Sequence, residues 1–404
     1  MSRLALDVAA PRLPPPAIAR RRITVVHLIH TMAYGGVETI VINWFRALDR
    51  SRFQAHVVCF ANPDNTEAAF VTVARRVGLD VTTIPWGRRK PVLGAARRLA
   101  GILRTVRADI LHTHNVYANL VGVLAARLAK VASVASLYVW SDFGWKRNLL
   151  QAVDRRALPY FDVITTQCEA TRRRTLAGGL PAARVKVLPA GLEPVCMMTA
   201  GERKERRRAA GVADDEVLLI NAARLYPEKA QDFLLRCFRR IRDQCAEARL
   251  WILGIGPLDG PLRAMCRSLG LEDSVRFAGF AEDLVAQLML ADVQVHPARD
   301  EGVPLAVCAG MGVGLPIVAS AVGGLPEILE GDRGVLVRSD DEAAFVEAVV
   351  GMIRDPARRR QLGLAARAFI ESEYSLATTV GRLEEIYHGL AGDSAVGSRI
   401  VRER

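Results

Sequence analysis

Residues 292–327, DVQVHPARDEGVPLAVCAGMGVGLPIVASAVGGLPE, decide the fold. The stretch predicts two buried strands, at 293–296 and 317–319, because each is a short apolar run bounded by turn residues. Pro304 follows the first strand and opens an apolar helix, as proline does in a first helical turn. The glycine pair 323–324 follows the second strand, and Pro326 opens the next helix. Two strand–turn–helix units are therefore expected side by side.

Each unit places a small-residue turn and a helix N-terminus at the carboxyl end of a strand. Open α/β sheets bind their ligands at that edge, and unpaired N–H groups at the positive end of a helix suit phosphate. Glu301 lies in the first turn, where its carboxylate can accept hydrogen bonds from ligand hydroxyls. We therefore predict the active site at this turn.

The chain of 404 residues, half of them apolar and 6% aromatic, is typical of α/β proteins and is too long for one core. Alternating strand and helix patterns run over 23–188 and begin again at 217, which predicts parallel sheets covered by helices. We predict two doubly wound α/β domains, over 21–195 and 196–375, that face each other across a cleft. A last helix, about 376–391, is grouped with the first domain.

The first 20 residues contain a triple proline after a short, interrupted apolar run, so we interpret them as a disordered arm and not as a signal peptide. No apolar run in the sequence reaches the roughly 18 residues that a membrane span needs. The seven cysteines are odd in number and include no Cys-x-x-Cys pair. We expect them to be buried thiols in a reducing compartment, the cytoplasm.

Charge is distributed unevenly along the chain. Residues 1–200 hold 28 Lys or Arg and 12 Asp or Glu, a balance of +16, whereas residues 201–404 hold 27 and 31, a balance of −4. Nucleic acid is not an expected partner, because no binding module and little aromatic interleaving accompany the cations. Two explanations stay open: an anionic membrane surface, with the protein peripheral on its inner face, and ordinary solubilising arginine.

Two cations, Arg224 and Lys229, lie in the segment ARLYPEK between the predicted strand 217–221 and a helix that begins near Ala230. Positive charge at a strand end and a helix N-terminus suits a diphosphate. A solvated loop is the alternative, but an arginine directly after an apolar strand favours function. The sequence has no Asp-x-Asp or similar spacing, so no metal is expected. These cations and the helix after Glu301 would then meet the phosphate charge.

Glycines mark two further strand ends. Gly254 and Gly256 are as consistent with a helix-entry turn as with a ligand seat. Gly35 and Gly36 follow the first predicted strand, 23–29, and permit a close backbone approach there. The Gly-x-Gly-x-x-Gly fingerprint of dinucleotide binding is absent from this turn.

His112 and His114 lie at the end of a strand predicted at 109–113. Residues i and i+2 of a strand share a face, which would suit a metal pair, but no third ligand is adjacent in the sequence. We expect His112 inside the strand and His114 in the following loop, where a histidine beside a cleft can orient or deprotonate a hydroxyl. A structural role is the common alternative for a lone histidine.

These clusters, in this order and spacing, resemble the retaining glycosyltransferases of family 4, which have the GT-B fold. The resemblance spans residues 23–390, and its specific part comprises ARLYPEKAQDFLLRCF, LWILGIGPL, VRFAGF and DEGVPLAVCAGMGVGLPIVASAVGGLPEIL. It implies two Rossmann-like domains, of which the second holds a nucleotide-sugar donor, UDP- or GDP-linked. It further implies transfer with retention, without metal or cofactor, to a saccharide or lipid-linked acceptor in polysaccharide or glycolipid synthesis.

The resemblance also assigns roles to individual residues. Arg224 and Lys229 would bind the donor diphosphate, Glu301 would hold hydroxyls of the donor sugar, and His114 would face the sugar and the acceptor. These four are the expected catalytic residues. Further donor contacts, mostly through the backbone, would come from Gly35, Gly36, Gly254, Gly256, Ala278, Gly279, Gly302, Val303, Pro304 and Leu305.

Two positions depart from the family's pattern. Ala309 stands eight residues after Glu301, where a second glutamate would bind the ribose hydroxyls, and Ala190 stands where asparagine is common. A lost charged contact costs about 1.5–3 kcal/mol, which is about one to two orders of magnitude in affinity. A catalytically degenerate module that serves as a partner or regulatory subunit is therefore the alternative function, and a sugar-nucleotide epimerase of the same fold is a third.

Overall fold

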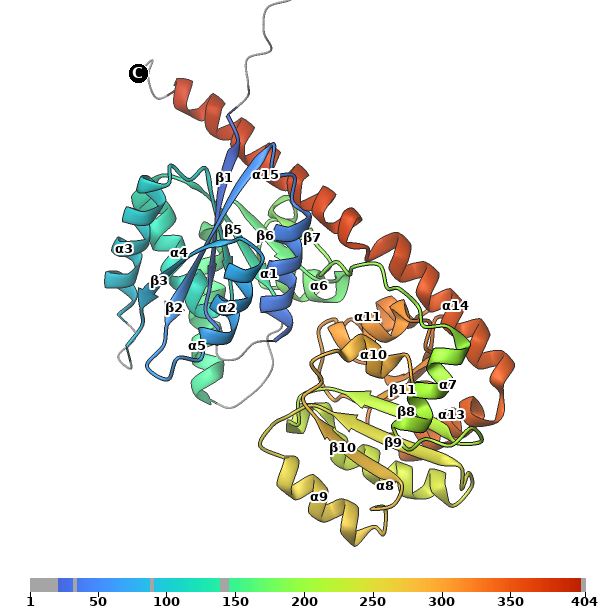
Figure 1. Ribbon diagram of the computed structural model, residues 1–404. Coiled ribbons are helices and arrows are strands. Elements are labelled where there is room, and N and C mark those ends of the chain that lie inside the picture. The colour runs from blue at the N-terminus through green and yellow to red at the C-terminus, as the bar shows by residue number, and fades with distance from the viewer. Residues whose placement is uncertain (1–20, 32–34, 88–90, 139–144, 401–404) are drawn as a thin grey trace, which may run out of the picture.

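The computed structural model describes residues 21–31, 35–87, 91–138 and 145–400, and the arm expected at 1–20 lies outside them. Two α/β halves follow one another along the chain (Figure 1), each built on a parallel sheet flanked by helices. We call them the first half, which contains β1 to β7, and the second half, which contains β8 to β13. This architecture is the predicted fold class.

In the described residues, the sheet of the first half has seven parallel strands in the order β3-β2-β1-β4-β5-β6-β7. The direction of strand addition reverses between β1 and β4, which is the switch point of a doubly wound sheet. The strands are β1 (Ile23–Ile29), β2 (Phe53–Ala61), β3 (Asp80–Pro85), β4 (Ile110–His114), β5 (Ala132–Leu137), β6 (Val163–Thr166) and β7 (Val185–Val187). The helices are α1 (Gly36–Ala47), α2 (Ala68–Arg76), α3 (Val92–Thr105), α4 (Val116–Ala129), α5 (Trp145–Ala157) and α6 (Glu169–Leu176), with short 3₁₀ turns at Leu158–Tyr160 and Ala182–Arg184.

The second sheet, again within the described residues, has six parallel strands in the order β10-β9-β8-β11-β12-β13, so its switch point lies between β8 and β11. The strands are β8 (Val217–Ala222), β9 (Ala248–Leu253), β10 (Val275–Gly279), β11 (Val293–His296), β12 (Ile317–Ser320) and β13 (Val335–Val337). The helices are α7 (Ala200–Ala209), α8 (Gln231–Arg242), α9 (Asp259–Ser268), α10 (Leu284–Leu288), α11 (Leu305–Gly312), α12 (Leu325–Leu329), α13 (Glu342–Arg354) and α14 (Pro356–Glu373), with a 3₁₀ turn at Pro227–Lys229.

The predicted strand–turn–helix pair is confirmed as β11–α11 and β12–α12. All four residues of each strand are buried, because helices cover both faces of a parallel sheet. The sequence pattern did not predict α14. Its buried residues Leu362, Ala366 and Ile370 recur once per turn, which is a weaker periodic signal than the wide apolar stripe of most helices.

The chain returns from the second half to the first after α14. The returning segment lies beside the outgoing one: the N–H of Leu192 donates to the carbonyl oxygen of Tyr374 at 2.8 Å, and the N–H of Leu376 donates to that of Leu192 at 2.8 Å. Helix α15 (Leu376–Ile400) then runs along the first half (Figure 1), in contact with α1, β1, β4 and β5. Its residues Leu383 and Tyr387 are buried there.

Six of the seven cysteines are buried free thiols, as expected, but Cys196 is exposed. The expectation is wrong at Cys196 because this residue lies in the extended segment between β7 and α7, outside the layers that cover the sheets. Burial of a cysteine is decided by where its segment lies in the fold, which the spacing of cysteines does not encode.

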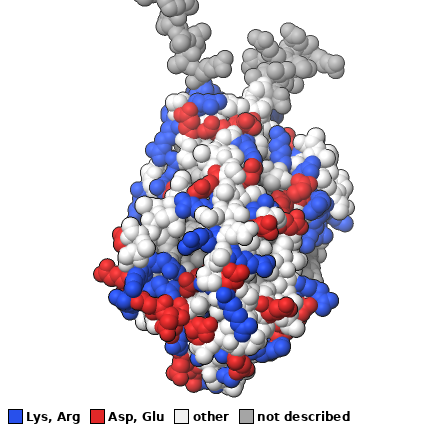
Figure 2. All heavy atoms as spheres, turned by 90° about the vertical axis from the view of Figure 1, so that its right-hand side faces the viewer, with Lys and Arg blue, Asp and Glu red and all other residues white. Residues whose placement is uncertain are grey.

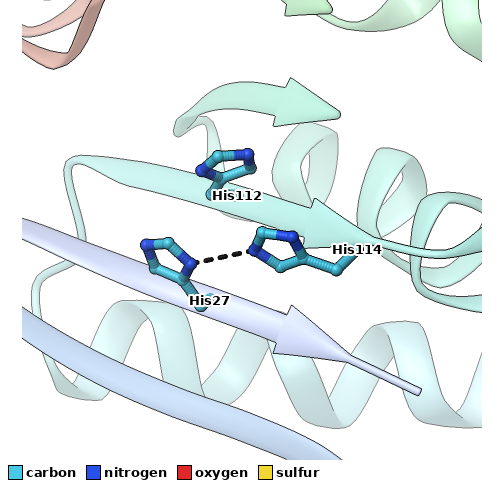
Figure 3. A group of neighbouring side chains, drawn as sticks. All are labelled: His27, His112 and His114. Atoms are coloured by element: carbon cyan, nitrogen blue, oxygen red, sulfur yellow. Dashed lines mark hydrogen bonds between the residues drawn. The ribbon is translucent and has the colours of Figure 1, made fainter. Parts of the chain in front are cut away.

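The structure corrects the prediction for the histidines. His114 is the last residue of β4 and not a loop residue, and its side chain is fully buried. A third histidine is also adjacent: β1 pairs with β4 so that His27 lies opposite His112 (Figure 3). The sequence could not indicate this neighbour, because the pairing joins strands that are separated by α1, β2, α2, β3 and α3.

One nitrogen from each of the three imidazoles lies within 4.8 Å of the others, and the rings form hydrogen bonds with one another or with hydroxyl groups. His27 Nδ1 lies 2.9 Å from His114 Nε2, the pair joined in Figure 3. Tyr387 Oη lies 3.0 Å from His27 Nε2 and 2.7 Å from His112 Nδ1. The two remaining nitrogens have partners as well, His112 Nε2 with Ser136 Oγ at 2.8 Å and His114 Nδ1 with Tyr138 Oη at 2.7 Å.

Burial lowers the pKa of His27 to about 3. Burial and the neighbouring imidazoles also lower the pKa of His112 and His114 well below the ordinary 6.5. All three rings are therefore neutral in the folded protein at pH 7. Each of the six ring nitrogens takes part in one of five hydrogen bonds, so the rings form a hydrogen-bonded group and not an open set of metal ligands.

These pKa values predict a loss of stability in mild acid. Below pH 6.5 the unfolded chain binds protons at His27, His112 and His114 that the folded chain does not, so the free energy of unfolding falls as the pH falls. Each histidine contributes up to about 1.4 kcal/mol per pH unit, or about 4 kcal/mol per unit for the three. Above pH 6.5 this contribution to stability is constant.

Urea unfolding between about pH 7.5 and 5.5 measures this slope. We expect His27→Asn to reduce the total loss of stability over this range by about 1.4 kcal/mol, because the unfolded pKa of 6.5 lies at the midpoint of the range. The matched variant His388→Asn, at a partly exposed histidine outside the group, should leave this loss unchanged. Equal stability of the unchanged protein at both ends of this range would contradict the prediction.

Candidate active site

Glu301 lies in the β11–α11 turn and is only 8% exposed. One oxygen of its carboxylate, Oε1, accepts hydrogen bonds from two side chains: Lys229 Nζ at 2.5 Å and His296 Nε2 at 2.9 Å. The turn after β8 supplies Lys229, and β11 itself supplies His296 as its last residue. Two adjacent strand ends of the second sheet thus meet at one carboxylate.

The surroundings of Glu301 fix its charge. Burial raises the pKa of its carboxyl group, but the hydrogen bonds and charges of His296 and Lys229 outweigh burial and hold the pKa at about 2. Glu301 is therefore ionised throughout the neutral range. Its oxygens can accept hydrogen bonds from a ligand, but the group has no proton to donate.

Sequence reasoning missed His296. Since ionised Glu301 can only accept, Nε2 of His296 must carry a proton, while its Nδ1 is buried without a partner among the described residues. The available signal was the position of His296 at the last residue of an apolar strand, five residues before Glu301. Residues at the carboxyl end of a central parallel strand point to the ligand-binding edge.

Arg224 and Lys229 are placed differently, although they share a loop. The Lys229 side chain is 12% exposed and bound to Glu301, whereas the Arg224 side chain is 62% exposed. Arg224 lies 3.6 Å from Glu228 and stacks over the ring of Tyr226 at 4.8 Å. Arg224 can therefore turn toward an incoming anion at little cost, while Lys229 is held at the base of the site.

Arg299 ties the Lys229 turn to the Glu301 turn. Its guanidinium donates to both carboxylate oxygens of Asp232, at 3.0 and 3.1 Å, and to the carbonyl oxygen of Pro227 at 3.1 Å. Its backbone N–H donates to the carbonyl oxygen of Glu228 at 2.8 Å. A rigid, forked donor is suited to such a junction. The hydrogen bonds of Arg299, together with the direct bond between Lys229 and Glu301, therefore fix how far apart these two residues lie.

Glycines let the strand-end turns pack backbone to backbone. A Cβ on Gly323, whose φ is +58°, would lie 1.8 Å from the carbonyl oxygen of Glu301. Gly254 and Gly256 likewise lie against the loop of Arg224, where a Cβ would come within 1.9 Å of the Ala223 carbonyl oxygen and 2.4 Å of that of Leu225. These glycines position the loop that carries Arg224.

The remaining predicted residues lie at the facing edges of the two halves. A Cβ on Gly36, at the start of α1, would lie 3.0 Å from Leu305 Cδ1 at the start of α11, so these two predicted residues lie side by side where the halves meet. Gly35 precedes α1, and its N–H donates to Glu38 at 3.1 Å. Three others continue the Glu301 turn into α11: Gly302, Val303 and Pro304.

Ala278 and Gly279 end the edge strand β10, and Ala278 is exposed. The carbonyl oxygen of Gly279 accepts from the N–H of Gly254 at 2.7 Å, which places this end beside the glycine turn after β9. The structure thus brings most predicted residues of the second half to one edge. Among the predicted residues of the first half, His114 does not reach this edge: its side chain lies inside that half, with both ring nitrogens bound to protein groups.

The halves also touch through α6 and α12. One carboxylate oxygen of Glu327 accepts from the backbone N–H of Glu169 at 2.7 Å and from that of Ala170 at 3.3 Å, at the N-terminus of α6. Cys168 packs in the same cluster as Val303 and Leu325 of the second half. The two walls of the site are therefore in contact at their base. Among the described residues, no helix is both long and apolar enough to cross a membrane.

Two family models match the chain. The model described as Glycosyltransferase Family 4 matches residues 34–194, and the model described as Glycosyl transferases group 1 matches residues 216–355. Together they cover every strand of the two sheets except β1, which precedes the first match.

Curated relatives match over most of their length. A GDP-mannose-dependent α-(1-6)-phosphatidylinositol monomannoside mannosyltransferase of Mycolicibacterium smegmatis is 31% identical over 285 residues, which is 67% of this chain and 73% of the relative. A GDP-mannose-dependent monoacylated α-(1-6)-phosphatidylinositol monomannoside mannosyltransferase of Corynebacterium glutamicum is 27% identical over 87% of this chain and 94% of its own.

Among solved structures, HepE of Anabaena, in complex with UDP and glucose, superposes with a TM-score of 0.80 at 20% identity. The superposition covers 91% of this chain and all of that one. At this identity the likeness concerns the fold, and it is the GT-B arrangement of two Rossmann-like units. Taken with the relatives, the models and the strand-end site, it leads to one conclusion: the chain belongs to glycosyltransferase family 4 and is a glycosyltransferase.

Proposed function

We propose that the protein transfers a mannosyl residue from GDP-mannose to a lipid-linked saccharide, with retention of the anomeric configuration. The observation that supports this most is the buried, ionised Glu301 held between Lys229 and His296 at the strand ends. The choice of GDP-mannose rests on the mannosyltransferases among the relatives. A UDP-linked sugar is the second candidate donor, because HepE has been solved with UDP-glucose.

In this proposal each side chain has a separate task. Glu301 accepts hydrogen bonds from hydroxyls of the donor sugar through its free oxygen. Lys229 and the more mobile Arg224 neutralise the diphosphate, as charge-assisted donors do. The backbone from Gly302 to Leu305 and the start of α11 complete the phosphate contacts. With these cations in place the reaction needs neither a metal nor a further cofactor.

In this proposal the acceptor hydroxyl attacks the anomeric carbon from the same face that the diphosphate leaves, and the configuration is therefore retained. Oε1 of Glu301 is committed to two donors and its pKa is about 2, so this carboxylate is a weak nucleophile and a weak base. The departing phosphate then takes the proton of the acceptor hydroxyl, and Lys229 stabilises the charge that develops on the phosphate.

The alternative functions make different demands. A degenerate module that serves as a regulatory partner is favoured by Ala309 and opposed by the intact Lys229–Glu301–His296 group. An epimerase would convert the donor without any acceptor. Product analysis with donor alone, and then with donor and a lipid-linked acceptor, separates all three.

Glu301→Gln and Lys229→Met should both abolish detectable transfer from GDP-mannose and weaken donor binding. Glu301→Gln replaces a charged acceptor, which costs about 1.5–3 kcal/mol and thus about tenfold or more in donor affinity. Calorimetric titration and a radiolabelled transfer assay, each with and without EDTA, provide the measurements, and EDTA should change neither result.

The matched control for these variants is Glu216→Gln. Glu216 also forms a half-buried pair, with Arg249 at 2.5 Å, but it precedes β8 and so lies at the opposite edge of the second sheet. This variant should keep full activity. Transfer at the wild-type rate by Glu301→Gln would exclude the proposed role of the carboxylate.

Ala309→Glu should strengthen donor binding. Ala309 lies one turn after Leu305 on α11 and so shares its face, which is turned to Gly36 and the cleft. A carboxylate there can accept ribose hydroxyl bonds worth about 1.5–3 kcal/mol, so the dissociation constant of the donor should fall about tenfold or more. Ala309→Gln, which adds length without charge, should gain less. An unchanged constant in Ala309→Glu would show that the ribose is held elsewhere.

We also propose that the first half contacts the inner face of an anionic membrane, where a lipid-linked acceptor would lie. Acidic and basic side chains alternate on the face shown in Figure 2, so that face is not the contact surface. Exposed arginine pairs of α5, at 155 and 156, and of α6, at 173 and 174, are candidates among the described residues, and each well-placed cation adds about 1 kcal/mol.

Flotation with vesicles that contain anionic lipid tests this contact. The protein should float with these vesicles at low salt and remain behind with neutral ones. Replacing Arg173 and Arg174 by Glu should reduce flotation, whereas the same charge change at Arg239 and Arg240 on α8 of the second half should not. Equal flotation of the two double variants would count against a contact through α6.

A further inference from the structure

The hydrogen bonds around the buried histidines join end to end into one chain of groups. Ser136 is followed by His112, Tyr387, His27, His114 and finally Tyr138, with every link between 2.7 and 3.0 Å. Ser136 Oγ also shares a hydrogen bond with Thr165 Oγ1 of β6 at 2.7 Å, so the chain continues to that strand at this end. Four of its members come from the sheet strands β1, β4 and β5, Tyr138 directly follows β5, and Tyr387 comes from α15.

Each member of this chain can give one proton and must accept another. A neutral imidazole has one N–H and one bare nitrogen, and a hydroxyl has one O–H and lone pairs. Tyr387 touches two imidazoles and has a single proton, so it donates to one ring and accepts from the other. Once that choice is made, every other link has only one direction in which all buried groups are satisfied.

Two arrangements meet this condition. In the first, Tyr387 donates to His27, and all three histidines carry their proton on Nδ1. In the second, Tyr387 donates to His112, and all three carry it on Nε2. Mixed arrangements leave two donors or two bare acceptors facing each other in a buried site, which is costly.

We propose that Tyr387 of the returning helix is a positioning residue that couples the tautomers of His27, His112 and His114 into one unit. Tyr387 thereby sets which nitrogen of His114 carries the proton, and so whether His114 donates to Tyr138 or accepts from it. Tyr138 is only partly buried and directly follows β5 at the carboxyl edge of the first sheet, the half predicted to hold the acceptor. This role for the reaction rests on the proposed function.

Metal binding is a poorer account of the same residues. A cation would have to replace the His27–His114 bond, and the two bonds of Tyr387 would be lost with it. All three rings are fully buried or nearly so, in contact with aromatic rings such as Trp44 and Phe45. Neutral rings that complete one another's hydrogen bonds need no further charge at this site.

Long-range proton–nitrogen correlation spectra of the full-length, ¹⁵N-labelled protein read the tautomer of each histidine directly. The three rings should be neutral at pH 7 and share one tautomer. Different tautomers among His27, His112 and His114 in the unchanged protein would overturn the proposal.

Tyr387→Phe removes the coupling hydroxyl and keeps the ring. An unpaired buried N–H is rarer in proteins than an unpaired acceptor. Therefore His27 should turn its bare nitrogen to the Phe ring and place its proton on Nδ1, and His114 should follow. His112 should place its proton on Nε2, toward Ser136. The expected pattern in Tyr387→Phe is thus Nδ1 for His27 and His114 but Nε2 for His112, whichever arrangement the unchanged protein has.

Tyr374→Phe is the matched control, because Tyr374 is also a buried tyrosine and lies outside the chain of groups. It should leave all three tautomers as they are. A shared tautomer that persists in Tyr387→Phe, or the same change in Tyr374→Phe, would overturn the proposal.

The kinetic consequence is measured separately. Tyr387→Phe should lower kcat about tenfold, as the loss of about 1.4 kcal/mol does, with KM for the donor unchanged within about twofold. A normal kcat together with altered tautomers would overturn the positioning role in the reaction. Absence of transfer by the unchanged protein would instead count against the proposed function, and the spectra would still decide the coupling.

Discussion

A carboxylate that is 8% exposed cannot stay ionised without partners, and the second half is arranged around supplying them to Glu301. Lys229 comes from the turn after β8 and His296 from the end of β11, the two central neighbours at the switch point of the sheet. The cost of burying one charge is thus met by a second charge and a directed hydrogen bond. The glycines of the neighbouring turns let the backbone segments that carry Glu301 and Arg224 pack closely.

The same constraint leaves at this edge the groups that the proposed donor, a sugar joined to a diphosphate, would need. Among the described residues, Oε2 of Glu301 has no hydrogen-bond partner, Arg224 extends into solvent, and backbone N–H groups begin α11 beside them. In the proposed complex, the Glu301 carboxylate would meet the sugar, and Arg224 and the N-terminus of α11 would meet the two phosphates. Ala309 and Ala190 are the positions where the sequence departs from the pattern expected of the family. The carbonyl oxygen of Ala190 accepts from Trp44 Nε1 at 2.8 Å, a bond that any residue at this position could form.

The polar groups buried in the first half are neutral, unlike the ion pair of the second half. His27, His112 and His114 lie where burial lowers their pKa, and each ring completes its hydrogen bonds through another ring or a hydroxyl. Tyr387 joins this group from α15, the helix that follows the second half in sequence. The interior of the first half is therefore linked covalently and by hydrogen bonds to the segment that returns from the donor side.

The sequence by itself determined the alternation of strands and helices, the two sheets and the Glu301 turn. These follow from apolar runs, glycines and prolines within a few residues of one another, and such local signals are written along the chain. Only the tertiary structure decided that His296 bonds Glu301, that His27 lies opposite His112, and that His114 is buried instead of lining the cleft. Those facts depend on which strands become neighbours and which side chains share a face. Strand pairing across β1 and β4 and the return of α15 bring together residues that no spacing in the sequence connects.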